Sequence, residues 1–160
     1  MVCTKYKLWS INEAFDHLFP YLLDSRTDTS RPNIVWQMDF THLNCSLEGA
    51  PGSGHYLLLI VDTFNNCIIC SKVFFLKNKK GTITSNKLIK CLEQVINRRD
   101  ITQELILNAD RGPEFVSKEY YKFVSEHPFL EGSHSAAATP NHNAVVERMH
   151  RTFKNQTQQQ

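Results

Sequence analysis

From residue 33 onward, short apolar runs alternate with polar, turn-rich segments. Three of the apolar runs have the length of strands and cover residues 34–43, 55–62 and 67–76. The second and third runs are joined by a short turn at Asn65-Asn66, and short connections are typical of antiparallel strands. The sequence therefore predicts a three-stranded antiparallel meander, whose first strand is apolar enough to be covered on both faces.

After the meander, the apolar positions follow a helical period. A helix over 84–98 would bury one face, which consists of Leu88, Ile89, Leu92, Val95 and Ile96. The run at 104–108 is typical of a buried parallel strand, and a helix over 117–126 begins with a serine that is a suitable N-cap. A short strand at 133–138 and a last helix over 143–156 complete the series. This order predicts an α/β fold, a mixed sheet with helices on both faces.

The elements divide the chain into three parts. Residues 1–30 carry a rough helical stripe that Pro20 interrupts, followed by a polar connector, and we interpret them as an N-terminal helical arm and linker. Residues 31–156 hold the remaining elements and form the core domain. Residues 157–160 are expected to be a frayed tail.

Bulk composition narrows the class of protein. The chain has 160 residues, of which 41% are hydrophobic, and this is the size of one domain with a full core. The formal net charge of +2 is too small to indicate nucleic-acid binding by itself. No apolar run is long enough to cross a membrane, and the N-terminal segment lacks the apolar core of a signal peptide. We therefore expect an intracellular protein without a membrane partner.

The cysteines do not suggest a disulfide framework, because five of them occur at irregular spacing. Cys67 and Cys70 have the spacing of a zinc-ligand pair. However, a strand points residues three apart to opposite faces, and no second Cys or His pair accompanies them. We interpret them as reduced, half-buried thiols rather than zinc ligands.

Three acidic residues stand where a carboxylate is unusual. Asp39 lies near the end of the first strand, where burial is costly unless the carboxylate is hydrogen-bonded, paired or bound to a cation. Asp110 follows a buried strand and precedes a glycine loop, where open α/β sheets bind ligands. Glu147 shares one face of the last helix with Arg151 and Lys154. Simpler interpretations stay open for each: the aspartates as turn formers and the glutamate as part of a solvated face.

Taken together, the three acidic residues indicate metal-dependent phosphoryl transfer. That chemistry needs carboxylates that converge from rigid elements and hold two divalent cations about 3.5–4 Å apart beside the scissile phosphate. Carboxylate oxygens suit Mg²⁺, which takes its other ligands from water and from the substrate phosphate. Basic residues one and two helical turns after Glu147 would then meet the flanking phosphates of a nucleic acid.

Three blocks of sequence resemble the catalytic core of retroviral-type integrases. They occur in matching order over about residues 20–156, and they are most similar to the transposases of bacterial insertion sequences. The first block is RPNIVWQMDFTHL followed by HYLLLIVDTFNNCIICSKVF, the second is LILNADRGPEFVSKEYYKFV, and the third is NAVVERMHRTFK. Ala109 and the pair Pro113-Glu114 depart from the family's usual loop. One such motif is weak, whereas three in order are specific.

The resemblance implies an RNase H-like fold and a polynucleotidyl transferase that cuts DNA at an element end and joins that end to target DNA. It implies two Mg²⁺ or Mn²⁺ ions per site, one activating a water or a DNA 3′-hydroxyl and the other stabilising the leaving oxygen. The implied catalytic residues and metal ligands are Asp39, Asp110 and Glu147. The expected DNA contacts are the basic residues that follow on the last helix, Arg148, Arg151 and Lys154. Asp62 matches a family aspartate that is not a metal ligand.

The implied partners are DNA, a second copy of the chain in a homodimer or higher oligomer, and a separate end-recognition chain or domain. The apolar residues of the 84–98 helix and the N-terminal arm would supply the interface between copies. Two other classes stay open: a catalytically silent integrase-derived module that binds DNA or protein, and a plain ribonuclease H. The latter would need a fourth carboxylate and a basic handle that the sequence does not place. His42 and His150 are two histidines that could lie near the site. His42 is expected on the sheet surface, and His150 in solvent or at a phosphate.

Overall fold

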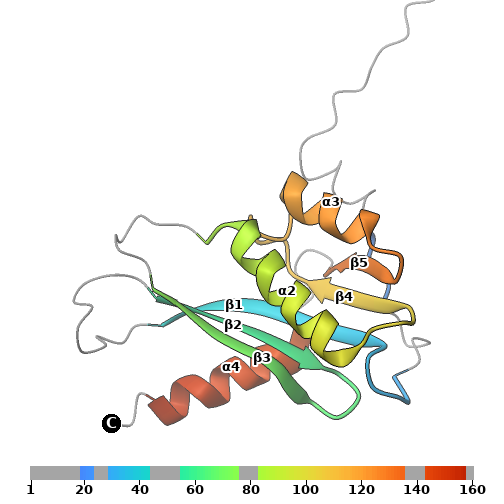
Figure 1. The fold of residues 1–160 in the computed structure, drawn as a ribbon. Helices are drawn as coiled ribbons and strands as arrows, with labels where there is room; N and C mark the ends of the chain where they lie inside the picture. Colours follow the sequence, from blue (N-terminus) through green and yellow to red (C-terminus); the bar gives the residue numbers. More distant parts are fainter. Residues whose placement is uncertain (1–18, 24–28, 44–54, 76–82, 136–142, 158–160) are drawn as a thin grey trace, which may run out of the picture.

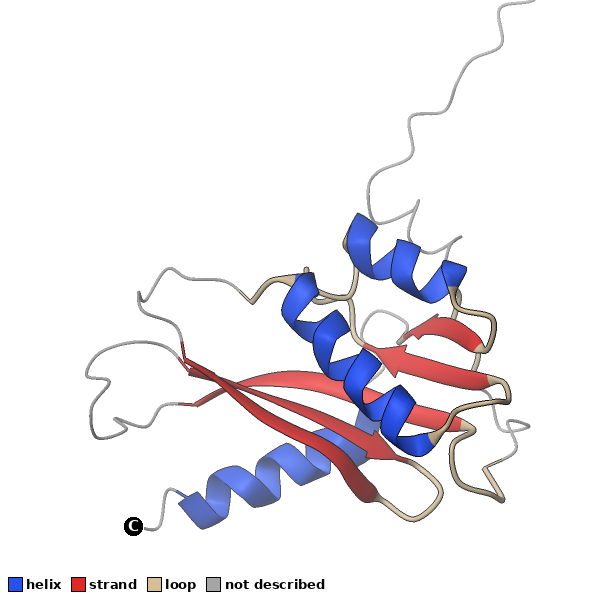
Figure 2. Cartoon of the chain, viewed as in Figure 1, coloured by secondary structure: helices blue, strands red, loops and turns tan. Residues whose placement is uncertain are grey.

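A five-stranded mixed sheet forms the centre of the molecule, with helices on both of its faces (Figures 1 and 2). The computed structural model describes residues 19–23, 29–43, 55–75, 83–135 and 143–157. The elements in chain order are β1 (Val35–Leu43), β2 (His55–Asp62), β3 (Cys67–Phe75), α2 (Ser85–Arg99), β4 (Leu105–Ala109), α3 (Lys118–Glu126), β5 (Leu130–His134) and α4 (Ala144–Thr157).

The sheet has the strand order β3-β2-β1-β4-β5, which places β1 at its centre. β1, β2 and β3 pair antiparallel and confirm the predicted meander, which turns at residues 63–66 between β2 and β3. β4 lies parallel to β1 on the other side, and β5 lies parallel to β4. The carboxyl ends of β1, β4 and β5 therefore lie along one edge of the sheet, the edge at which ligands bind in folds of this kind.

Alternating residues of β1 face two different layers, as the pleat of a strand requires. Trp36 and Met38 are fully buried in the larger core, which α2 and α3 cover. Leu43 lies in a smaller core, which α4 covers together with β2. Figure 1 shows α2 and α3 on one side of the sheet and α4 crossing the other. The prediction that β1 is covered on both faces is thus confirmed.

The predicted helices are confirmed with ends that differ by about one residue. Ser117 caps α3 as expected, because its Oγ accepts a hydrogen bond of 3.1 Å from the amide of Tyr120. One prediction about α2 is wrong: its apolar face cannot join two copies, since that face is buried in the chain's own core. The buried residues of this helix are Leu88, Cys91, Leu92, Val95 and Ile96.

Other predictions agree with the structure only in part. The last short strand was expected at 133–138, whereas β5 covers Leu130–His134. Cys67 and Cys70 in β3 are free thiols, of which Cys67 is exposed and Cys70 is half-buried. The predicted N-terminal helix lies outside the described residues except for its end at Phe19. Of the predicted tail at 157–160, Thr157 is the last residue of α4, and 158–160 lie outside the described residues. Within the described part of the chain, no helix has both the length and the apolar character that a membrane span needs.

Candidate active site

The sheet brings two of the three predicted carboxylates to neighbouring positions. Asp39 is the fifth residue of β1, and Asp110 follows directly after the last residue of β4. Because β1 and β4 are parallel and Met38 pairs with Ala109, Asp39 and Asp110 occupy the next position on each side. Both carboxylates therefore lie toward the same edge of the sheet.

The third carboxylate reaches this place on a helix. Glu147 stands in the first turn of α4, whose start is fixed to β1 by side-chain hydrogen bonds. The Gln37 Oε1 atom accepts bonds from the amides of Val145 at 3.1 Å and Val146 at 3.4 Å. These amides would otherwise lack partners, since the first turn of a helix has no preceding carbonyl groups. Gln37, which precedes Asp39 by two residues on β1, thus holds the start of α4 close to Asp39.

The charges of the three acidic residues act on one another. Burial, the largest cause, together with the negative charges of Asp110, Glu147 and Glu114 raises the pKa of Asp39 from 3.8 to about 7. The amide of Phe40 opposes the shift by hydrogen bonding. Asp39 is half-buried, whereas Asp110 and Glu147 are exposed. The site is therefore an acidic cluster whose half-buried member, Asp39, is costly to ionise.

Glu114 is a fourth carboxylate at this place, which sequence reasoning did not identify. A Cβ atom added to Gly112 would lie 3.0 Å from Asp110 Oδ1 and 3.1 Å from Glu114 Oε1, so both carboxylates border the same small space. The loop turns tightly here, because the amides of Phe115 and Val116 both bond to the Gly112 carbonyl. The turn brings Glu114 back toward Asp110, and the presence of a second acidic residue in the loop that follows Asp110 was the available indication.

His150 lies against Asp39, contrary to the prediction that it faces solvent or a phosphate. Its ring is buried, with Nε2 3.2 Å from the Asp39 carbonyl oxygen and 3.5 Å from Asp39 Oδ2. Burial lowers the pKa of His150 to about 4, so the ring is neutral at pH 7 and the contact with the carboxylate is not an ion pair. The prediction was wrong because the face of α4 that packs on β1 includes residue 150. His42 is exposed, as expected.

The three basic residues predicted to contact DNA follow Glu147 along α4. Arg148 and Arg151 are exposed, and Lys154 is half-buried. The charge of Lys154 contributes to the lowered pKa of His150, which places that ammonium group near the site. Basic side chains therefore flank the acidic cluster on its helical side.

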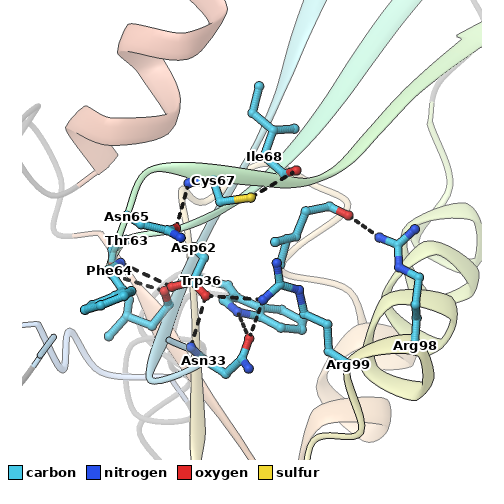
Figure 3. Close-up of polar contacts among 12 residues, drawn as sticks. Asn33, Trp36, Asp62, Thr63, Phe64, Asn65, Cys67, Ile68, Arg98 and Arg99 are labelled. Carbon is cyan, nitrogen blue, oxygen red and sulfur yellow. Dashed lines mark hydrogen bonds and ion pairs between the residues drawn. The ribbon is translucent and has the colours of Figure 1, made fainter. Parts of the chain in front are cut away.

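Asp62 is held apart from the cluster by partners of its own (Figure 3). It is 1% exposed and lies opposite Trp36 in the sheet register, three positions before Asp39 along β1. Its carboxylate accepts hydrogen bonds from the amides of Asn33 at 3.0 Å and Phe64 at 3.1 Å, and Arg99 lies 3.6 Å away. These contacts give Asp62 a structural role at the other end of β1.

The model of the integrase core domain family matches residues 29–140, which is more than half of the chain. The chain belongs to the integrase core domain family. The matched range includes Asp39, Asp110 and Glu114, whereas Glu147 lies beyond it. The predicted membership of the family and the predicted RNase H-like fold are thereby confirmed.

Relatives of this integrase core come from retroviruses and from bacterial insertion sequences. The Gag-Pol polyprotein of baboon endogenous virus is 29% identical over 129 residues, which are 81% of this chain and 7% of the polyprotein. The transposase InsF for insertion sequence IS3A of Escherichia coli is 27% identical over 133 residues, 83% of this chain and 42% of the transposase. The chain thus spans less than half the length of these relatives.

Solved structures similar to this chain are also integrase catalytic cores. The HTLV-2 integrase catalytic core domain in complex with magnesium, in its trimeric form, is 27% identical with a TM-score of 0.53. That match covers 78% of this chain and 68% of the other. The dimeric form of the same domain has a TM-score of 0.50 and 28% identity.

The acidic cluster of the integrase core has the donor chemistry that Mg²⁺ or Mn²⁺ requires. Its ligands are hard carboxylate oxygens, and a cation among them would remove the repulsion that acts on Asp39. Among the described residues, no three His, Cys, Asp or Glu side chains stand close enough to hold one ion together. The oxygen donors of the cluster thus suit a divalent cation, whereas the described side chains stand too far apart to hold one ion between three of them.

Proposed function

We propose that this integrase core carries out metal-dependent cleavage at a DNA end and transfer of that end to target DNA. The observation that carries the proposal is the register of β1 and β4, which sets Asp39 beside Asp110 at one edge of the sheet. The charges of Asp110 and Glu147, which contribute to the raised pKa of Asp39, support it. Carboxylates from a central strand, a loop and a helix act on one place at the sheet edge where ligands bind. Membership of the integrase core family supports the same function.

The proposed catalytic residues are the three predicted carboxylates. Asp39, Asp110 and Glu147 would bind two divalent cations, Mg²⁺ or Mn²⁺, together with oxygens of the scissile phosphate. Bound cations of this kind lower the pKa of an attacking water or hydroxyl and stabilise negative charge on the leaving oxygen. An HTLV-2 integrase core is known in complex with magnesium, which supports the choice of cation.

Other residues of the chain would bind and orient the substrate. Arg148, Arg151 and Lys154 would contact phosphates beside the reacting bond, because they follow Glu147 along α4. His150 would hold Asp39 in place through the contact of its neutral ring with the Asp39 carbonyl. No side chain is required as a nucleophile, since a water or a DNA 3′-hydroxyl attacks the phosphorus directly.

The proposed partners follow from the same function. DNA element ends and target DNA would be the substrates, and a separate chain or domain would supply end recognition. Similar integrase cores occur in trimeric and dimeric forms, which supports a homodimer or a higher oligomer here.

The test is an assay of nicking and joining on short DNA duplexes in Mg²⁺ and in Mn²⁺. We expect the wild-type chain to cut and join, and Asp110→Asn to lose at least about 100-fold of the rate, as expected for loss of a metal ligand. Glu126→Gln serves as the control, because Glu126 is an exposed acid on α3. Equal rates in the wild type and Asp110→Asn would contradict the proposal.

Two observations favour alternatives that the same assay separates. The carboxylates do not meet around one ion among the described residues, which favours the silent module, and that module would bind duplexes without cutting them. Glu114 supplies the fourth carboxylate that a ribonuclease H needs. Cleavage of an RNA–DNA hybrid without cleavage of DNA duplexes would support that third function.

A further inference from the structure

A chain of buried polar side chains runs beneath the acidic cluster and joins the elements that carry it. Ser133 Oγ donates to Asn108 Oδ1 at 3.0 Å, and Asn108 Nδ2 donates to Asn143 Oδ1 at 3.5 Å. Asn143 Nδ2 then donates to the Met38 carbonyl at 3.1 Å. With Gln37, which caps α4, we call these side chains the amide bridge: Gln37, Asn108, Ser133 and Asn143.

Three of the four members of the amide bridge lie close to one carboxylate each along the chain. Gln37 precedes Asp39 by two residues, and Asn108 precedes Asp110 by two. Asn143 precedes Glu147 by four residues, which is about one helical turn. The bridge therefore connects the backbone of β1, the end of β4 and the start of α4 immediately below the site.

Apolar packing alone would hold α4 on the sheet, and the amide bridge adds direction to that packing. Its four side chains are at most 7% exposed, so each must be hydrogen-bonded to offset the cost of burial. Apolar contacts permit a helix to slide or rotate by a fraction of a turn, whereas a hydrogen bond requires one distance and one angle. A satisfied buried network is thus a means to specify a single arrangement of three elements.

We propose that the amide bridge sets the separation of Glu147 from Asp39 and Asp110, and that its members are positioning residues for cation binding. This inference rests on the proposed function, because it assigns the bridge to the same site. The bridge shares no atom with the carboxylates and acts on them through the backbone.

The amide bridge also reaches the segment that precedes the core. The amide of Leu22 donates to Ser133 Oγ at 3.1 Å, so the serine hydroxyl joins this segment to Asn108. Loss of the hydroxyl would break the bridge at the end that lies farthest from Glu147. An effect of that loss on cation binding would therefore have to travel along the bridge.

The first experiment measures Mn²⁺ binding by calorimetry. Gln37→Met removes the acceptor at nearly constant volume, and Ser133→Ala removes the hydroxyl at the far end. We expect each variant to bind Mn²⁺ about tenfold more weakly, which is the smaller of the losses usual when a residue that orients a metal ligand is replaced. Gln37→Glu keeps the acceptor for the helix amides and should bind Mn²⁺ more tightly than Gln37→Met.

Asp62→Asn is the matched control for a general loss of stability. It weakens a buried polar cluster at the other end of β1 and should leave Mn²⁺ binding within about twofold of the wild type, since it lies outside the site. Wild-type affinity in both bridge variants would overturn the proposal, as would an equal loss in the control.

The second experiment needs no metal and separates this inference from the proposed function. In EDTA at pH 8, Glu147→Gln removes the repulsion between Glu147 and Asp39. If the bridge holds these two residues close together, this substitution should raise Tm more in the wild-type background than in the Gln37→Met background, where the helix start is no longer held. Equal effects in both backgrounds would overturn the role of the bridge. A wild-type chain that binds no Mn²⁺ would instead contradict the proposed function, and the comparison of Tm values would still decide for or against the bridge.

Discussion

At the scale of single residues, Asp39 is where burial and repulsion meet. Its carboxylate is covered on one side by His150 and faces the charges of Asp110, Glu147 and Glu114. In the unfolded chain this group loses its proton near pH 3.8, and in the folded chain near pH 7. Between these values the folded state binds more protons, so stability falls as pH rises from about 4 to about 7. The metal-free fold is therefore strained at its own candidate site.

Asp39→Asn should remove that strain and make the metal-free protein more stable. At pH 8 we expect the free energy of unfolding to rise by no more than roughly 4 kcal/mol, the equivalent of the whole pKa shift. The gain should shrink toward pH 4, where the folded carboxyl is protonated and the unfolded one, with its pKa of 3.8, is only partly ionised. His150 contributes in the other direction, since its lowered pKa costs stability below about pH 6.5 in both proteins.

Urea unfolding in EDTA between pH 4 and pH 8 measures this difference. The variant Glu126→Gln, at an exposed acid on α3, should show no comparable dependence on pH relative to the wild type. A difference between Asp39→Asn and wild type that stays constant over the whole range would rule out the raised pKa as its cause.

At the scale of elements, periodicity predicted the strands of the meander and the helices well, because each buries one face or two at a regular spacing. β5 was misplaced because LEGSH is polar by composition, and the apolar run that follows it looks more like a strand. Pairing with β4, from Leu105 opposite Leu130 to Ala109 opposite His134, determines where β5 forms. Local sequence does not contain that tertiary choice.

The residues of the candidate site also fall into two groups, those that the sequence indicates and those whose positions depend on tertiary structure. Asp39, Asp110 and Glu147 could be named as candidates from the sequence because their settings and motif blocks are visible along the chain. Glu114 was missed because its position depends on a loop that turns back. The burial of His150 against Asp39 was not predicted because it depends on the face by which α4 packs. The apolar face of this helix contacts β2 and β1, and it consists of Val145, Val146, Met149 and Phe153.

The opposite face of α4 should contact DNA phosphates, and salt dependence can test this. For Arg151→Ala we expect weaker binding to DNA duplexes and a slope of log K against log salt that is smaller by about one, as for loss of one phosphate contact. Arg148→Ala and Lys154→Ala should behave alike. Lys122→Ala, which removes an exposed cation of α3, is the control and should leave the slope unchanged. Parallel slopes for Arg151→Ala and wild type would remove Arg151 from the interface.

At the scale of the whole molecule, β1 carries the candidate site at Asp39 and a buried polar cluster near its start. Near its start, the Asn33 side chain accepts hydrogen bonds from Arg99 at 3.0 Å and Trp36 at 3.3 Å, beside buried Asp62 (Figure 3). This cluster joins the segment before β1 to the end of α2 and to the turn after β2. It fixes the strand that carries Asp39 without contributing to the acidic cluster.

Arg99→Ala should therefore cost stability and spare the chemistry. It leaves the buried Asp62 without its cation, and we expect a loss of about 2–3 kcal/mol in the free energy of unfolding. The rate of DNA nicking, measured well below the Tm of the variant, should stay within about twofold of the wild type. Lys90→Ala, at an exposed cation of the same helix, should change neither quantity. A large fall in nicking at full folding would place the cluster within the functional site.

The segment before the core is part of the same fold, and Gly132 shows how closely it is packed. Phe19 is 6% exposed, and a Cβ atom added to Gly132 would lie 2.4 Å from its ring, a distance that ordinary contacts do not reach. The ring also stacks edge-on against Tyr120 and His134.

Gly132→Ala should therefore destabilise the protein by about 1–3 kcal/mol through overpacking, and Phe19→Ala by about 3–5 kcal/mol through a cavity. If the two residues exclude each other as the geometry requires, Gly132→Ala will cost much less in the Phe19→Ala background, because the space for the new methyl group is then free. Urea unfolding of the four proteins gives the coupling energy, and simple additivity would show that Phe19 does not rest on β5 in solution.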